Sequence, residues 1–201
     1  MCRLTHSTVS CRHILTDAGL QLKKSVNEWQ VPLNQEWVVV ALSRYAVLLG
    51  NMQQFTEALP LIQTAIDTVL RKHSQLQTPR STELLRSLYQ EQLLILDKAL
   101  SQPLQLKKPE MIQKLLDQLG TLHKVLADSR NNNEGAAALC KAFLAKHIIM
   151  LRRENVEAIS IAKQYLSAAL TWHDTLKNEG GAGLPLQGLS ALALASAQTG
   201  A

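Results

Sequence analysis

Residues 42–65 read LSRYAVLLGNMQQFTEALPLIQTA, and this stretch decides the fold. Apolar residues recur every three or four positions on both sides of Gly50-Asn51, which is the spacing of helices that bury one face. Gly and Asn are common where helices end, so the pattern predicts two helices joined by a short turn. Because a short connection forces consecutive helices to lie side by side, we expect an antiparallel hairpin.

The same helical spacing recurs from end to end of the chain, and helix-breaking residues interrupt it. Boundaries fall at Val31-Pro32, before Pro103, at the Asn-rich run 131–133 and at the Gly-rich run 180–183. The pattern predicts seven or eight helices, over about residues 14–29, 34–49, 54–73, 78–101, 109–128, 136–152, 156–177 and 186–198. Residues 136–152 and 156–177 are joined by only a few residues, which predicts a second antiparallel hairpin.

The composition favours helices throughout. The 201 residues include 37 Leu and 22 Ala, which are strong helix formers, but only 19 Val and Ile and eight aromatic residues. Sheets favour branched and aromatic side chains, so an all-β fold and a parallel-sheet enzyme are both disfavoured. The hydrophobic content of 46% argues against wholesale disorder. We therefore expect an all-α protein.

The balance of charge is mildly basic. Lys and Arg number 21 against 16 Asp and Glu, which gives a formal net charge of +5. The basic residues are spread along the chain, singly or in pairs such as Lys23-Lys24 and Arg152-Arg153. This distribution favours acidic partners in general and is more typical of solvated helix faces than of a nucleic-acid-binding stripe. Nucleic-acid binding through the basic surface is the alternative function.

The cysteine count and the distribution of charged residues indicate the subcellular location of the protein. Three cysteines, Cys2, Cys11 and Cys140, are too few and too odd for a disulfide framework and suit a reducing compartment. The first 30 residues lack the unbroken apolar run of a signal peptide. Even the charge-free residues 180–201 contain too many Gly and polar residues for a membrane span. We expect an intracellular protein, cytoplasmic or nuclear, without membrane contact.

Two sets of Cys and His residues could carry chemistry. Four possible zinc ligands lie near the N-terminus, but their spacing is not one that recurs in zinc sites, so a frayed terminus is favoured; they are Cys2, His6, Cys11 and His13. Cys140 and His147 share one face of a predicted helix but lie two turns, or roughly 10 Å, apart. A buried thiol and a core histidine are favoured over a nucleophilic pair.

Two further sites lack their partner residues. His173-Asp174 has no accompanying Ser or Cys nucleophile, so we expect a solvent-facing helix end. The Gly-rich run 180–183 lacks the Lys and Ser/Thr of a phosphate loop, which favours a flexible linker. The sequence thus predicts no catalytic residues, no metal and no cofactor, and the protein is expected not to be an enzyme.

Residues 42–65 resemble a tetratricopeptide repeat. In that family a large–small pair on the first helix lets the second helix pack closely, and Tyr45-Ala46 with Ala58 match those positions. The chain departs from the pattern in two places. Ala46 replaces the usual Gly of the close contact, and Gln53 stands where the turn usually has Gly, which implies a slightly different turn.

Weaker matches follow later in the chain. Leu144-Ala145 and Ala162 resemble a second repeat, and Leu189 with Leu192-Ala193 resembles a first helix with no second helix after it. The resemblance implies stacked antiparallel hairpins forming a short α-solenoid of seven or eight helices; an ordinary multi-helix bundle is the alternative. The predicted organisation is an N-terminal helix and leader over 1–33, the hairpin array over 34–178, and a Gly-rich linker with a capping or interrupted-repeat helix over 179–201.

The resemblance implies a non-catalytic scaffold or adapter that binds a peptide or helix of a protein partner in a concave groove and serves as a subunit of a larger complex. First helices would line the groove, through Val40, Ser43, Val47 and Asn51 in one hairpin and Leu139, Ala142 and Lys146 in another. Plain surface or packing roles are the alternative for each residue. Ser43 and Val47 stand where family members that clamp a terminal carboxylate have Lys and Asn, which disfavours that mode. The oligomeric state stays open.

Overall fold

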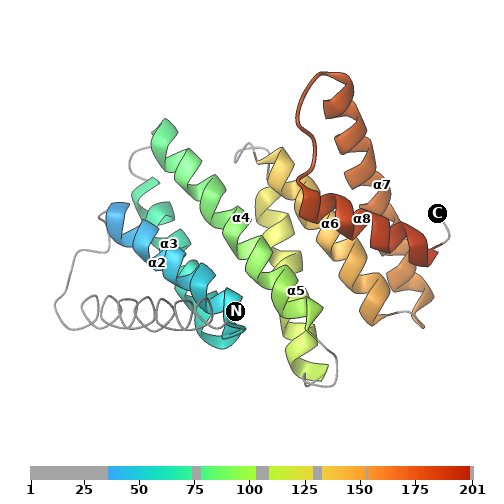
Figure 1. Ribbon diagram of the computed structural model, residues 1–201, viewed down its shortest axis with the longest axis horizontal. Coiled ribbons are helices and arrows are strands. Elements are labelled where there is room, and N and C mark those ends of the chain that lie inside the picture. Colours follow the sequence, from blue (N-terminus) through green and yellow to red (C-terminus); the bar gives the residue numbers. More distant parts are fainter. Residues whose placement is uncertain (1–35, 74–77, 103–108, 129–132, 153, 200–201) are drawn as a thin grey trace, which may run out of the picture. The chain divides into compact units, whose positions relative to one another are not determined.

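The structure is a computed structural model that describes residues 36–73, 78–102, 109–128, 133–152 and 154–199 (Figure 1). These residues form seven α-helices, which confirms the all-α prediction. The helices are α2 (Glu36–Asn51), α3 (Phe55–His73), α4 (Pro79–Ser101), α5 (Pro109–Leu126), α6 (Glu134–Leu151), α7 (Val156–Asn178) and α8 (Leu186–Thr199). The predicted helix over 14–29 and the leader over 1–33 lie outside the described residues.

The contacts between residues divide the chain into two compact units, Met1–Ile95 and Leu96–Ala201. The boundary falls inside α4, which gives most of its length to the first unit and its last residues to the second. None of the described helices combines the length and the apolar character needed to span a membrane.

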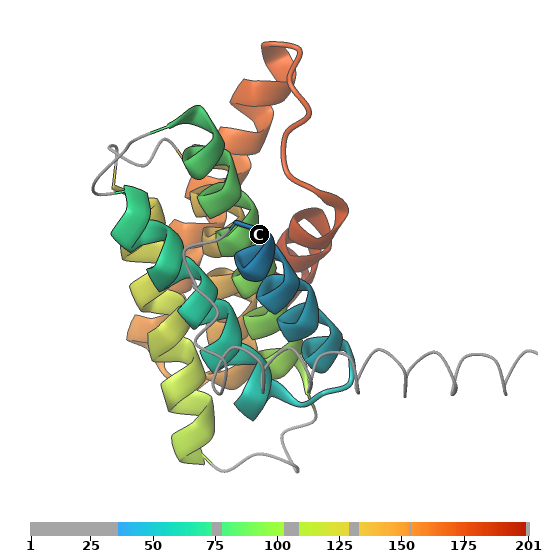
Figure 2. The same ribbon diagram turned by 90° about the vertical axis from the view of Figure 1, so that its left-hand side faces the viewer.

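In the first unit α2 and α3 form the predicted antiparallel hairpin, and Figure 2 shows the two helices side by side. Tyr45, Ala46 and Ala58, the positions that match the repeat, are all buried. The two alanines are fully enclosed, and small side chains at such positions let helices approach closely. The apolar side chains of residues 42–65 therefore form the helix–helix contact that their spacing predicts.

The turn between α2 and α3 is closed by two backbone hydrogen bonds. Gln53 N–H donates to the Gly50 carbonyl at 3.2 Å and Gln54 N–H donates to the Leu49 carbonyl at 2.9 Å, which is the Schellman pattern of a helix end. Gln53 has a φ of 64°, in the left-handed region that glycine adopts without cost. A non-glycine residue thus holds the turn position where the repeat family has Gly.

The first part of α4 packs on this hairpin through polar contacts. Thr78 caps the helix, since its hydroxyl accepts the Ser81 N–H at 3.1 Å. Arg80 pairs with Glu36 of α2 at 2.8 Å, and the Gln92 amide donates to Gln63 of α3 at 2.9 Å. One helix therefore contacts both members of the hairpin.

In the second unit α6 is the central helix, in contact with α5, α7 and α8. The α6–α7 pair is the second predicted hairpin. Asn155 caps α7 by accepting the Ala158 N–H at 2.9 Å. Most of α6 is buried, including five alanines: Ala136, Ala137, Ala138, Ala142 and Ala145. These short side chains allow three helices to pack around one.

The last helix, α8, lies against α6 and also contacts α7. Gly188 of α8 is buried against Leu139 of α6, and a Cβ at Gly188 would lie 2.9 Å from Leu139 Cδ1. Glycine at this position therefore lets the Leu139 side chain pack directly against the backbone of α8. The opposite side of α8 carries Leu186 and Leu194, which remain exposed.

The α2–α3 turn yields a stability prediction. We expect Gln53→Gly to raise the free energy of unfolding by about 0.5–1 kcal/mol, because glycine removes the cost of the left-handed φ. Gln90→Gly, an exposed position within α4, is the control and should lower it by about 1 kcal/mol. Denaturant unfolding of the three proteins checks this, and equal losses at both positions would contradict the turn assignment.

Candidate functional site

The structure places the predicted groove residues of α2 in different environments. Val40 is 37% exposed, Asn51 is exposed and Val47 is half-buried. Ser43 is buried, and its hydroxyl donates to the Glu91 carboxylate of α4, which also accepts from Arg44. Val40, Val47 and Asn51 therefore remain open to a partner, whereas Ser43 is used within the first unit.

The predicted groove residues of α6 are covered by the second unit itself. Leu139 lies beneath Gly188 of α8, and Ala142 is fully buried. Lys146 has a side chain only 12% exposed, and its ammonium donates to Asp97 at 2.8 Å and to Ser101 at 3.0 Å. A partner would reach these three residues only after repacking of the unit, so a groove along this part of α6 is not open.

Asp97, Ser101, Lys146 and His147 form a polar cluster between the end of α4 and α6. His147 Nε2 lies 2.7 Å from Asp97 Oδ1, the same oxygen that accepts from Lys146. Burial alone raises the pKa of Asp97, but the hydrogen bonds and charges of His147 and Lys146 outweigh it, so the pKa is lowered from 3.8.

This cluster has the distances of a serine–lysine pair but not its chemistry. A lysine acts as a general base only when it is neutral. The Lys146 ammonium is engaged in an ion pair with Asp97, and the same carboxylate oxygen also contacts the His147 ring, so these groups are already bound to one another. We therefore interpret the cluster as a structural contact that holds the end of α4 against α6.

The two buried residues Cys140 and His147 lie where the sequence predicts, in the core of the second unit. The Cys140 thiol donates to the Leu119 carbonyl at 3.5 Å, and burial raises its pKa far above the ordinary value. Only the thiolate is a strong nucleophile, so this environment makes the sulfur unreactive at neutral pH.

Another histidine, His123, packs edge-on against Tyr165, with ring centroids 5.3 Å apart. Burial, followed by the charge of Lys141, lowers the pKa of His123. Its Nε2 atom is buried and has no hydrogen-bond partner in the described part of the chain. The ring contact with Tyr165 accounts for its position.

The expectation of a solvent-facing His173 is wrong, although Asp174 beside it is exposed. His173 is buried because the chain folds back over it, and its Nδ1 accepts the Leu184 N–H at 3.0 Å. Gly183 has a φ of 64°, and a Cβ there would lie 2.4 Å from that nitrogen. The Gly-rich run thus provides both the left-handed φ and the space that this turn requires.

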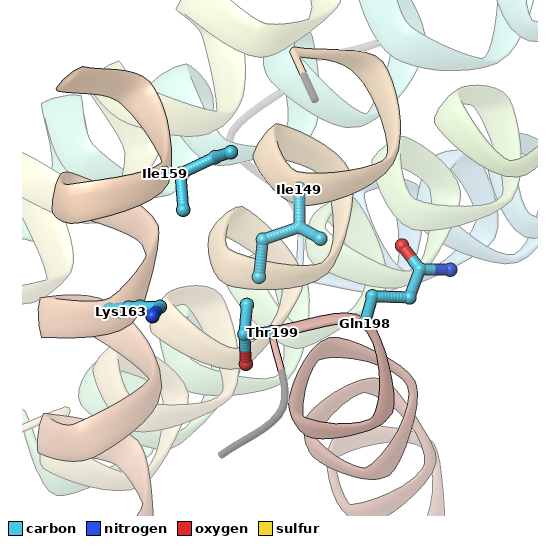
Figure 3. Close-up of a pocket in the computed structure, with 5 residues that line it drawn as sticks. All are labelled: Ile149, Ile159, Lys163, Gln198 and Thr199. Carbon is cyan, nitrogen blue, oxygen red and sulfur yellow. The ribbon is translucent and has the colours of Figure 1, made fainter. Parts of the chain in front are cut away.

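A pocket of about 380 Å³ opens where α6, α7 and α8 meet. Figure 3 shows Ile149 of α6 and Ile159 of α7 pointing toward one another, with Thr199 of α8 beside them. Lys163 of α7 and Gln198 of α8 complete the lining. The pocket therefore combines apolar walls with one cationic side chain.

Next to this pocket runs the outer face of α8, which we define by Leu186, Ser190, Ala193, Leu194 and Ala197. All five are exposed, and their spacing of three or four residues places them on one side of the helix. Leu186 is 75% exposed and Leu194 is 47% exposed. Residues 180–201 contain no ionisable side chain, so this is an uncharged, largely apolar helix face.

The chain matches no family model, no curated protein and no solved structure. The arrangement of its own residues therefore carries the functional argument. In the described part of the chain no three His, Cys, Asp or Glu side chains converge as metal ligands do. The N-terminal set Cys2, His6, Cys11 and His13 lies outside the described residues.

The predicted partner-binding residues include neither the pocket nor the outer face of α8. The signal for the face was present, because Leu186, Ser190 and Leu194 recur at helical spacing in a segment without charge. The pocket left no signal, since its residues come from three helices and are up to 50 positions apart.

The polar cluster yields a second prediction. We expect Asp97→Asn to lower the free energy of unfolding by about 3 kcal/mol, because it leaves the Lys146 ammonium enclosed without its carboxylate. Asp174→Asn, at an exposed position, should change it by less than about 0.5 kcal/mol.

The same pair has a pH signature. Because the pKa of Asp97 is lower in the folded protein than its ordinary 3.8, the unfolded chain binds the proton first, and stability falls as pH drops below about 5. Unfolding measured from pH 7 to pH 2 should show a shallower acid loss for Asp97→Asn than for the wild type. Parallel curves would contradict the assigned ion pair.

Proposed function

We propose that the protein is a non-catalytic protein-binding module, built from stacked tetratricopeptide-like hairpins, that receives a partner helix on the outer face of α8. The observation that carries this proposal is that an uncharged, apolar helix face is exposed on a helix whose other side is already packed. Large exposed apolar surfaces on soluble domains commonly mark interaction sites. A subunit of a larger complex would bury this face on its partner.

The packing of α8 supports the tetratricopeptide-like part of the proposal. A stacked array places the first helix of each unit against both helices of the unit before it. The contacts of α8 with α6 and α7 follow that order, and the outer face of α8 is the surface on which a following helix would pack. A helix supplied by another protein can occupy the same surface.

Burial of the exposed leucines of α8 would favour binding of a partner helix on this face. Complete burial of one leucine side chain stabilises an association by about 1.5–3 kcal/mol. Leu186 and Leu194 lie two turns apart and would contact positions about two turns apart on one partner helix. The helix-in-groove mode of recognition uses this spacing. The exposed α2 residues Val40, Val47 and Asn51 remain a second, sequence-predicted surface on the first unit.

The proposal predicts which single change abolishes binding. We expect Leu194→Glu to reduce capture of the partner from the native source at least tenfold, because it places a charge in the centre of an apolar contact. Leu70→Glu, an equally charged change at a position of α3 that is 38% exposed, should leave capture unchanged. Quantitative mass spectrometry of the captured proteins provides the measurement.

Both variants change exposed side chains and should retain the wild-type unfolding midpoint. Equal capture by Leu194→Glu and wild type would contradict the proposed site. If only Val47→Glu loses capture of the partner, the binding surface lies on α2 and not on α8.

A further inference from the structure

The outer face of α8 leads directly into the pocket at the end of that helix. Leu194 and Gln198 are four residues apart and so lie one above the other on α8, and Gln198 lines the pocket. A helix that follows the exposed stripe from Leu186 to Leu194 would therefore reach the pocket at its far end. The stripe and the pocket form one continuous surface within the second unit.

Lys163 is the only ionisable side chain that lines this surface. It is exposed and makes no ion pair with the described residues. Its neighbours at three and four positions along α7 are Ile159, Ser160, Leu166 and Ser167, none of which is charged. Within the described residues, no carboxylate pairs with the ammonium that Lys163 contributes to the pocket lining.

The remaining polar groups of the pocket leave room for an anionic group. The Thr199 hydroxyl donates to the carbonyls of Ala195 and Ser196, so its hydrogen is used within α8. Gln198 lines the pocket from α8, across from Lys163 of α7, and its amide points away from Lys163 (Figure 3). Ile149 and Ile159 supply the apolar walls, and a volume of about 380 Å³ admits an aliphatic side chain between them.

We propose that the partner helix is acidic at the end that meets this pocket, with one carboxylate on Lys163 and an aliphatic side chain one turn away between Ile149 and Ile159. The one-turn separation follows from Ile159 and Lys163, which are four residues apart on α7. This inference rests on the proposed function and adds the chemistry and the direction of the partner. Charge complementarity selects it, since the described residues of this face and pocket include a single cation and no anion.

The cation sets specificity more than affinity. The apolar stripe supplies most of the attraction, while an exposed ion pair changes binding by about two- to fivefold. The Lys163 charge lies at one end of an otherwise uncharged surface, so it distinguishes the two directions in which a helix could lie.

A displayed library of 18-residue helices tests this inference. Leucines are fixed at every third or fourth position and all other positions are randomised. We expect the wild-type protein to enrich Asp or Glu at one fixed place beside the leucine stripe. Lys163→Met should lose that enrichment, and Lys163→Glu should enrich Lys or Arg at the same place.

Lys177→Met is the matched control, because Lys177 is also exposed on α7 but does not line the pocket. It should select the same acidic helices as the wild type, with affinities that fall about two- to fivefold only in Lys163→Met. Acidic enrichment that persists in Lys163→Met, or that is absent from the wild type, would overturn the inference.

The two proposals fail in different ways. If the selected helices lose binding to Leu194→Glu but bind equally well whatever residue stands at position 163, the outer face of α8 is the binding site and the inference of an acidic partner is wrong. No selected helices, or helices that bind Leu194→Glu as well as the wild type, would reject both. A concentration-dependent dimer that Leu194→Glu dissociates would assign the face to a second copy of the chain and overturn the inference.

Discussion

The packing of this protein depends on how closely its helices approach one another, and small side chains at buried positions set that distance. Ala46 and Ala58 are enclosed between α2 and α3, and the alanines of α6 are enclosed among α5, α7 and α8. Gly188 of α8 packs on Leu139 of α6, where a methyl group would lie 2.9 Å from the Leu139 Cδ1 atom. A larger side chain at Gly188 therefore requires the neighbouring side chains or α8 itself to shift.

This close packing determines which surface is left for a partner. Because α8 is pressed onto α6 through its glycine and alanines, its leucines are divided between the two sides of the helix: Leu192 is buried while Leu186 and Leu194 are exposed. The polar groups nearby are already engaged, with Asp97 holding Lys146 and His147, and His173 holding the turn before α8. Apolar contact is therefore the interaction that the outer face of α8 offers, and Lys163 adds one charge at its end.

The helices and hairpins could be predicted because their causes are local. Apolar spacing and short turns lie within a few residues of one another, and the cap at Thr78 is a single residue beside its helix. Burial by distant segments could not be predicted. Ser43 is covered by a helix that supplies Glu91, Leu139 by Gly188, and His173 by a chain reversal, and each depends on contacts invisible to a local pattern. For the same reason the predicted groove residues of α6 are enclosed, and the pocket was found only from the structure.

The central claim is that the Gly188–Leu139 contact holds α8 so that its outer face is presented to a partner. Amide hydrogen exchange in Gly188→Leu tests it most directly, with Ala197→Leu as a control of similar size on the exposed side of the same helix. The account predicts that amides of residues 186–199 exchange at least tenfold faster in Gly188→Leu, while those of α6 and α7 stay protected and Ala197→Leu matches the wild type. Unchanged protection of α8 in Gly188→Leu, or an equal loss in both variants, would contradict it.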